Sequence, residues 1–288
     1  MDDLTGKVAV ITGGARGVGL GLAKAFAGQG MRLVLSDINT TTLDEAVATL
    51  RASGAEAIGV TADVSDTAAV NHLRDEAFAR FGTVHVLCNN ATGGGGGPFC
   101  EPIDVSVWET AMSATVYSVL RGLNAFLPRM LDQGDGHIVN TASRQGLVPS
   151  PILGSYPPAK SAVIALSEML HAELAERGSP VGVTVLTPGG VKTEGILASL
   201  ALHESGQRDD PAMREFLASR VAAAVDPVDL GRLVVRAIRE GALYVNTHGE
   251  TLKWLQERVD RMVADSEKIG YLVGTDTTSD HNGAAGIP

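Results

Sequence analysis

The chain has 288 residues, of which 44% are hydrophobic and 19% are charged, which is the composition of a globular protein and not of a disordered one. Its 23 Lys and Arg residues against 33 Asp and Glu residues give a net charge of −10, and this argues against a nucleic-acid partner, because phosphate binding needs a basic face. Two cysteines cannot build a disulfide framework, the seven histidines show no metal-ligand pair, and no apolar run reaches the roughly 18 residues that a membrane span needs. We therefore expect a cytoplasmic protein without a metal site, whose partner is a small molecule.

Short β-branched runs alternate with longer helical patterns along most of the chain. The predicted strands cover residues 7–12, 32–36, 57–61, 84–88, 138–141, 181–186 and 243–246, and the first predicted helices cover residues 17–29, 41–53 and 65–81. Nearly continuous apolar strands separated by helices are typical of a parallel sheet that is covered on both faces. The fold class predicted is α/β: a single-domain, Rossmann-type, doubly wound parallel sheet of seven strands, with its ligand at the carboxyl ends of the strands.

Nothing in the sequence divides this pattern into two domains. We expect one catalytic domain over residues 1–273, which includes a helical insertion at 195–224 that could serve as a lid over a substrate and a C-terminal helix at 249–264. Residues 274–288 are rich in Thr, Asp and Gly, so a disordered tail is expected there. The five glycines from Gly93 to Gly97 follow the fourth strand. They could form a mobile rim of the site or a flexible loop that has no role in binding a ligand.

A glycine-rich turn lies between the first strand and the first helix, in the run Thr12-Gly-Gly-Ala-Arg-Gly-Val-Gly19. Glycines let the backbone approach a pyrophosphate, and the N-terminus of the following helix directs N–H groups and a positive dipole end at the anion. The position between strand and helix therefore favours a dinucleotide site over a plain tight turn. The candidate cofactor-binding residues in this turn are Gly13, Arg16, Gly17, Val18 and Gly19.

The second strand ends at Asp37, whose carboxylate could accept both hydroxyls of an adenosine ribose and would repel a 2′-phosphate. This favours NAD over NADP as the cofactor. Arg16 is the opposing signal, because its guanidinium could pair with that phosphate. Alternatively, Arg16 is solvated or pairs with Asp37.

A phenol and an ammonium stand four residues apart on one helix face in the run Tyr156-Pro-Pro-Ala-Lys160. A phenol with a pKa near 10 is a poor acid or base at neutral pH, and a cation within hydrogen-bonding range favours the phenolate. Ser143 ends the fifth strand, where its hydroxyl could orient a substrate carbonyl or merely cap a turn.

These motifs together resemble the short-chain dehydrogenase/reductase family, in its shorter, dehydrogenase-type branch. The resemblance spans about residues 5–245 and rests on the glycine turn, Asn89-Asn90-Ala91, Ser143, Tyr156-x-x-x-Lys160 and Pro188-Gly189. It implies an oxidoreductase that transfers a hydride between NAD(H) and a secondary alcohol or ketone. It also implies a homodimer or homotetramer built on the helices that carry residues 101–133 and 155–178.

The resemblance also implies a role for each matching residue. Tyr156 would be the acid in carbonyl reduction and the base in alcohol oxidation, Lys160 would lower its pKa and hold the nicotinamide ribose, and Ser143 would hydrogen-bond the substrate oxygen. Further cofactor contacts would come from Asp63 and Val64 at the adenine, Asn90 near the ribose, and Pro188, Gly189, Val191 and Thr193 at the nicotinamide carboxamide.

The sequence departs from the family pattern at several positions. Thr115 stands where the family usually has an asparagine that supports the proton relay, so we keep it as a candidate catalytic residue with a weakened or rerouted relay. Thr92 replaces the glycine that usually follows Asn-Asn-Ala. Pro157 and Pro158 fit a helix that begins near Ser155, because first-turn N–H groups have no helical partner. The Thr115 departure motivates an alternative function, a nucleotide-binding sensor or scaffold with lost or weak turnover.

Apolar residues in the insertion suggest a hydrophobic or aromatic substrate. The alternative is that they pack the insertion onto the body of the protein. They are Ile196, Leu197, Leu200, Met213, Phe216 and Leu217.

Overall fold

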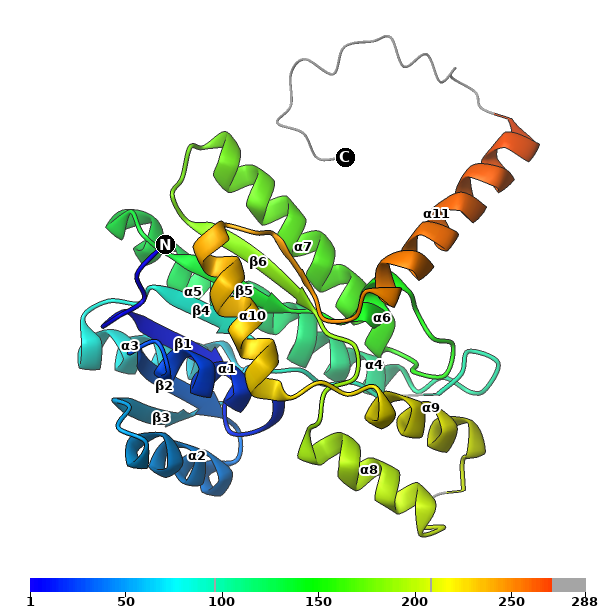
Figure 1. The fold of residues 1–288 in the computed structure, drawn as a ribbon, viewed down its shortest axis with the longest axis horizontal. Helices are drawn as coiled ribbons and strands as arrows, with labels where there is room; N and C mark the ends of the chain where they lie inside the picture. Colours follow the sequence, from blue (N-terminus) through cyan, green and yellow to red (C-terminus); the bar gives the residue numbers. More distant parts are fainter. Residues whose placement is uncertain (96, 208, 271–288) are drawn as a thin grey trace.

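Seven parallel strands form the centre of the molecule, in the order β3-β2-β1-β4-β5-β6-β7 (Figure 1). The computed structural model describes residues 1–95, 97–207 and 209–270. The strands are β1 (Val8–Thr12), β2 (Arg32–Asp37), β3 (Ala57–Thr61), β4 (Val86–Asn89), β5 (His137–Thr141), β6 (Gly182–Thr187) and β7 (Tyr244–Asn246). This confirms the predicted seven-stranded parallel sheet, although β4 begins two residues later than expected.

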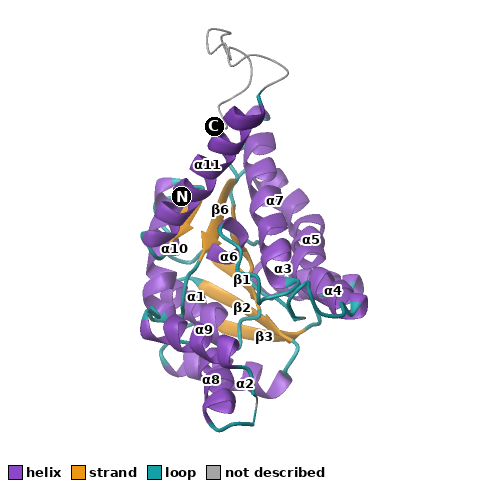
Figure 2. Ribbon diagram, turned by 90° about the vertical axis from the view of Figure 1, so that its right-hand side faces the viewer, coloured by secondary structure: helices purple, strands orange, loops and turns teal. Residues whose placement is uncertain are grey.

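Helices cover both faces of the sheet (Figure 2). They are α1 (Gly17–Ala27), α2 (Thr40–Ala52), α3 (Thr67–Phe81), α4 (Val105–Met112), the π-helical turn η1 (Ser113–Tyr117), α5 (Ser118–Gln133), α6 (Arg144–Leu147), α7 (Tyr156–Glu176), α8 (Glu194–Glu204), α9 (Pro211–Ala222), α10 (Pro227–Glu240) and α11 (Glu250–Ile269). None of the helices in the described ranges combines the length and the apolarity of a membrane-crossing segment.

Alternating side chains of each strand enter two separate cores. In β1, Ala9 and Ile11 pack with α1, α2 and α10, whereas Val8 and Val10 pack with α3, α5 and α7 on the other face. A strand whose successive side chains point to opposite faces must be apolar at every position when both faces are covered. This is why the strands read as continuous apolar runs.

The insertion after β6 consists of two helices and not one helical segment. A turn separates α8 from α9: Gly206 has a left-handed φ of 73°, and Pro211 begins α9, where its missing N–H costs no helical hydrogen bond. The C-terminal helix α11 extends beyond the predicted range of 249–264. It ends at Ile269, and the next residue, Gly270, has a positive φ of 91° that does not continue the helix. It projects away from the sheet (Figure 1). The predicted tail at 274–288 lies outside the described residues.

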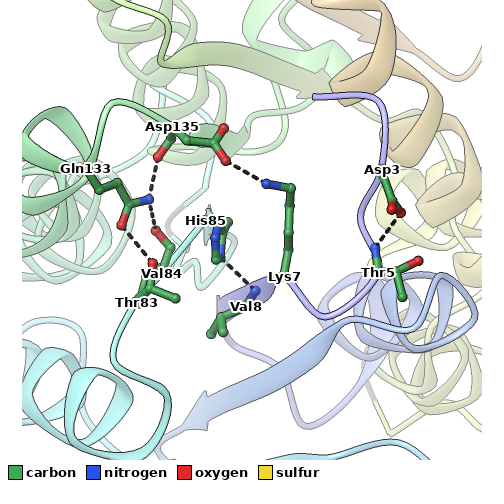
Figure 3. Close-up of polar contacts among 9 residues, drawn as sticks. All are labelled: Asp3, Thr5, Lys7, Val8, Thr83, Val84, His85, Gln133 and Asp135. Atoms are coloured by element: carbon green, nitrogen blue, oxygen red, sulfur yellow. Dashed lines mark hydrogen bonds and ion pairs between the residues drawn. The ribbon is translucent and has the colours of Figure 1, made fainter.

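Polar side chains form a cluster of hydrogen bonds and ion pairs at the amino ends of β1 and β4 (Figure 3). The Lys7 ammonium lies 2.6 Å from the Asp135 carboxylate, and Gln133 donates to the main-chain oxygen of Val84 at 2.8 Å. The main-chain N–H of Val8 donates to Nδ1 of His85 at 3.0 Å, and burial lowers the pKa of this histidine. The polar groups at this end of the sheet are paired with one another. The polar groups at the opposite end of the sheet are not all paired in this way within the described residues.

Candidate active site

A cavity of about 690 Å³ opens at the carboxyl ends of β1, β2, β4, β5 and β6. Because the strands are parallel, residues that follow each of them meet at this edge. It is lined by most of the predicted site residues: Gly13, Arg16, Gly17, Val18, Asp37, Asp63, Val64, Asn90, Ser143, Tyr156, Lys160, Pro188, Gly189, Val191 and Thr193. Gly19 and Thr115 are not among the described residues that line it.

The glycine turn is held against the end of β4 by hydrogen bonds. The side-chain amide of Asn90 donates to the main-chain oxygens of Thr12 and Gly13 at 3.0 and 3.3 Å, and the Thr12 hydroxyl accepts from the N–H of Asn90 at 3.0 Å. A Cβ atom on Gly19 would lie 2.1 Å from the oxygen of Gly13, so only glycine lets α1 pack this closely against the turn. Asn90 therefore shapes the turn in addition to lining the cavity.

The N-terminus of α1 faces this cavity without a side-chain cap. Arg16 is the N-cap residue, forms no capping hydrogen bond and is exposed, and the first turn carries no acidic residue. Gly17 has a left-handed φ of 55°, and a Cβ atom there would lie 3.1 Å from Cγ2 of Thr193. Unsatisfied N–H groups at a narrow glycine turn fit the pyrophosphate of a dinucleotide. The buried Thr141 hydroxyl, which also lines the cavity, has no hydrogen-bond partner among the described residues.

The Asp37 carboxylate ends β2 at the side of this turn. One of its oxygens accepts from the N–H of Ala15 at 3.3 Å, and the other accepts from the N–H of Asn39 at 3.1 Å. No ion pair in the described ranges joins it to Arg16, so the pairing considered for these two residues is not formed. The carboxylate is thus positioned by two amides at the edge of the cavity beside the glycine turn.

Asp63 and Val64 lie beyond β3 on the same side of the cavity. The Asp63 carboxylate accepts from the N–H of Ser65 at 2.8 Å, and hydrogen bonds from Ser65 lower the pKa of Asp63. The main-chain oxygen of Val64 accepts from Arg121 at 3.3 Å, which ties this loop to α5.

Ser143, Tyr156 and Lys160 come together where β5 and α7 meet. Ser143 is buried and caps α6, accepting the N–H of Gln145 at 3.2 Å, so its own proton is still available for donation. Helix α7 begins at Tyr156, which confirms that the two prolines occupy the first turn. The Lys160 ammonium donates to the main-chain oxygen of Thr141 at 2.7 Å and lies 5.7 Å from the centroid of the Tyr156 ring.

The pKa of Tyr156 is above its ordinary value in this structure, contrary to the expectation that Lys160 lowers it. Burial raises this pKa, and the Ser143 hydroxyl and the Arg220 charge oppose the rise. Burial also lowers the pKa of Lys160 to about 7, and its amine faces Thr141 instead of the phenol oxygen. Lys160 and Arg220 both line the cavity with Tyr156; the Lys160 amine lies 5.7 Å from the ring centroid, and the Arg220 charge lowers the pKa of the phenol.

Thr115 is buried in the π-helical turn and is bonded to the glycine-rich loop. Its hydroxyl donates to the main-chain oxygen of Gly93 at 2.8 Å, accepts the N–H of Gly93 at 3.1 Å, and lies 3.0 Å from the Thr92 hydroxyl. No hydrogen bond in the described ranges joins it to Lys160. Thr115 thus anchors a loop, and its part in a weakened or rerouted proton relay stays a prediction.

The glycine-rich loop lies against Tyr156 at Gly94 and is hydrogen-bonded to Thr115 at Gly93 and to Ser155 at Gly95. Ser155 donates to the main-chain oxygen of Gly95 at 2.9 Å, so the loop is tied to the start of α7. A Cβ atom on Gly94 would lie 3.0 Å from Cδ2 of Tyr156. The absence of side chains on this loop leaves space for the ring.

Arg220, on α9, is a cavity-lining residue that sequence reasoning missed. Its Nη2 atom donates to the main-chain oxygen of Gly189 at 2.5 Å, and its guanidinium lies 5.3 Å from the centroid of the Phe216 ring. Of the apolar insertion residues expected near a substrate, Ile196 lines the cavity, while Leu217 is buried in packing. No local pattern marks Arg220, because 64 residues separate it from Tyr156.

Comparisons with known proteins agree with this geometry. Residues 7–200 match the family model described as short chain dehydrogenase. The C alpha-dehydrogenase of a Sphingobium species is 30% identical over 268 residues, which are 91% of this chain and 87% of that protein. A short chain dehydrogenase/reductase from Burkholderia phymatum, solved in complex with NAD, is 37% identical with a TM-score of 0.83, covering 92% of this chain and 97% of that one. The L-sorbose reductase of Gluconobacter frateurii, complexed with NADPH and L-sorbose, is 26% identical with a TM-score of 0.74, covering 85% of this chain and 97% of that one.

Proposed function

The chain belongs to the short chain dehydrogenase family of oxidoreductases, and we propose that it transfers a hydride between NAD(H) and a secondary alcohol or the corresponding ketone. The observation that carries the proposal is the meeting of Ser143, Tyr156 and Lys160 in the cavity that also contains the glycine turn. When bound, a nicotinamide dinucleotide supplies the hydride donor or acceptor.

In this proposal Tyr156 exchanges the proton with the substrate oxygen. At neutral pH the phenol holds the proton that it would donate to a ketone as it is reduced. Burial raises its pKa and makes it a weaker acid, and the Ser143 hydroxyl and the Arg220 charge act against that rise. In the opposite direction the phenol must lose its proton first, and the Ser143 hydroxyl and the Arg220 charge favour that state. The Ser143 hydroxyl would donate a hydrogen bond to the substrate oxygen as negative charge develops there.

Lys160 would hold the nicotinamide ribose beside Tyr156. The amine is buried at the end of β5, next to the unpartnered Thr141 hydroxyl. Gly13, Gly17 and the open N-terminus of α1 would hold the pyrophosphate, and the segment from Pro188 to Thr193 would bind the nicotinamide carboxamide.

NAD is the cofactor that the Asp37 position supports. A carboxylate fixed by two amides accepts ribose hydroxyls and repels a 2′-phosphate. Arg16 is exposed and has no ion pair to Asp37 in the described ranges, so its guanidinium is available to a 2′-phosphate and is the opposing signal. We propose a substrate with a hydrophobic or aromatic body, supported by Ile196 and Val191 in the cavity wall and by Phe216 behind Arg220.

Replacement of Tyr156 by Phe tests the proposed reaction directly. NADH oxidation with a panel of hydrophobic ketones should fall by about 10²- to 10⁴-fold in the variant, because the proton donor is removed. NADH affinity, measured by fluorescence titration, should change little. A variant that retains most of the rate would show that Tyr156 is not the acid.

A second candidate function is a nucleotide-binding sensor or scaffold with lost or weak turnover. It is favoured by Thr115, whose hydroxyl is engaged by Gly93 and not by Lys160. Tight NADH binding without turnover of any ketone in the panel would select it.

We also propose that the protein is a homodimer or homotetramer built on α4, α5 and α7. Exposed apolar side chains on these helices and on η1 support this: Val105, Tyr117, Leu120, Leu131 and Met169. Sedimentation of the full chain tests the assembly, and Met169→Glu should weaken it.

A further inference from the structure

Arg220 lines the cavity where the reaction is proposed, and Arg144, which directly follows the cavity residue Ser143, has different surroundings. Arg144 follows Ser143, and its guanidinium lies 3.5 Å from the Glu250 carboxylate and 5.0 Å from the centroid of the Trp254 ring. Its charge is therefore balanced from α11. Arg220 has no ion pair among the described residues.

The two terminal nitrogens of the Arg220 guanidinium differ in their hydrogen bonding. Nη2 donates to Gly189, whereas Nη1 is buried and has no hydrogen-bond partner in the part of the chain that the structure describes. A buried guanidinium without an acceptor or a counter-ion is costly, so such groups are normally paired. The fold thus places at the cavity wall a cation that still has an unused hydrogen-bond donor.

The backbone fixes this arginine in place. The main-chain oxygen of Arg220 lies so close to Gly190 that a Cβ atom there would be 2.2 Å away, and the N–H of Val225 donates to the oxygen of Gly190 at 3.0 Å. Val191 also pairs with Val225 in a parallel bridge. The end of α9 is therefore fastened to the Pro188–Thr193 segment, which holds Arg220 in the wall of the cavity that Tyr156 also lines.

No acid in the described cavity wall balances this charge. The lining acids are Asp37, Asp63 and Glu194; the first two lie at the adenosine end, and none of the three pairs with Arg220. Burial lowers the pKa of Arg220, the Arg144 charge lowers it further, and only an ionised Tyr156 would raise it. A ligand with negative charge is the complement of such a wall.

We propose that Arg220 is a specificity-determining residue that binds a carboxylate carried by the substrate, so that the preferred substrate is a keto or hydroxy acid with an apolar or aromatic body. This rests on the proposed hydride transfer at Tyr156. The planar guanidinium matches a carboxylate, and a charge-assisted hydrogen bond at a partly buried site favours the acid over its neutral analogue.

Matched pairs of ligands test the proposal without depending on turnover. Benzoates and the corresponding benzamides, including the 3- and 4-acetyl derivatives, are titrated calorimetrically into the full-length protein saturated with NADH. The benzoates should bind about 10- to 100-fold more tightly than the amides. This preference should be lost in Arg220→Gln, partly retained in Arg220→Lys, and unchanged in Arg214→Gln, which removes an exposed arginine from the same helix.

Three outcomes would overturn the proposal. The first is equal binding of acids and amides, which includes no binding of either at the solubility limit, and the second is a preference for the acid that survives in Arg220→Gln. The third is a loss of NADH affinity in Arg220→Lys that is as large as the loss of benzoate affinity. The last outcome would assign Arg220 to the cofactor. Turnover of uncharged ketones is measured separately. Turnover without a carboxylate preference refutes this inference alone, and a preference without turnover of any ketone refutes the proposed reaction.

Discussion

The hydroxyl oxygens of Thr92 and Thr115 lie 3.0 Å apart, although 23 positions separate them in the sequence. These are two of the positions at which the chain departs from the family pattern. Their contact, together with the bonds from Thr115 to Gly93, fixes the loop that lies against Tyr156. The two departures are therefore one structural feature.

A double-mutant cycle at these two positions should show coupling. Thr115→Asn alone introduces a larger amide against the Thr92 hydroxyl, and Thr92→Gly alone removes the partner of Thr115, so each should lower the free energy of unfolding and kcat. The double variant should recover part of both losses, with a coupling energy of about 0.5–2 kcal/mol. Urea unfolding and ketone-dependent NADH oxidation measure the two quantities, and strictly additive losses would contradict the coupling.

Gly94→Ala should slow catalysis through Tyr156. The new Cβ atom would lie 3.0 Å from Cδ2 of the ring, so the ring or the loop must shift by a few tenths of an ångström. We expect kcat to fall by about tenfold or more, because small displacements of reacting groups are expensive, with little change in NADH affinity. Gly97→Ala is the matched control, since its Cβ atom would make an ordinary contact of 3.6 Å with Glu101. Equal effects of the two changes would exclude the proposed contact.

Lys160 should make the stability of the cofactor-free protein depend on pH in the alkaline range. Burial lowers its pKa from 10.5 to about 7, so between these values the unfolded chain holds a proton that the folded chain has lost. Stability therefore rises with pH across this window and loses that gain as the pH falls to 7. Lys160→Met should remove the dependence, which we expect to be about 2–4 kcal/mol.

Urea unfolding at pH 7 and pH 10 measures this difference for the wild type and for Lys160→Met. Lys24→Met, which removes an exposed amine from α1, is the control and should follow the wild type. If Lys160→Met retains the full pH dependence, the buried lysine is not its source.

Asp37→Ser should shift the cofactor preference toward NADP. The carboxylate that would repel a 2′-phosphate is removed, while Arg16 stays available at the turn. We expect the ratio of kcat/KM for NADH to that for NADPH to fall by about 10- to 100-fold, as the loss of one charge interaction and one hydrogen bond allows. A wild-type preference for NADPH would already contradict the role assigned to Asp37.

Local sequence patterns were sufficient for the fold and for the proposed acid. The apolar runs predicted the strands because the central ones are buried on both faces, and the edge strands β3 and β7 still keep buried apolar positions. The glycine turn was recognisable because it must lie between a strand and a helix. Tyr156 and Lys160 are one helical turn apart, so their proximity is decided by the helix itself.

The contacts that modify this site were decided by tertiary packing alone. Nothing near Arg220 in the sequence marks it, because its place at the cavity depends on how α9 is fastened to the segment after β6. The same holds for the hydrogen bond from Lys160 to the main-chain oxygen of Thr141 and for the pairing of Thr92 with Thr115. Periodicity reports which face of an element is buried; which polar atoms meet across elements depends on the relative placement of whole helices and strands, and only the folded chain fixes that.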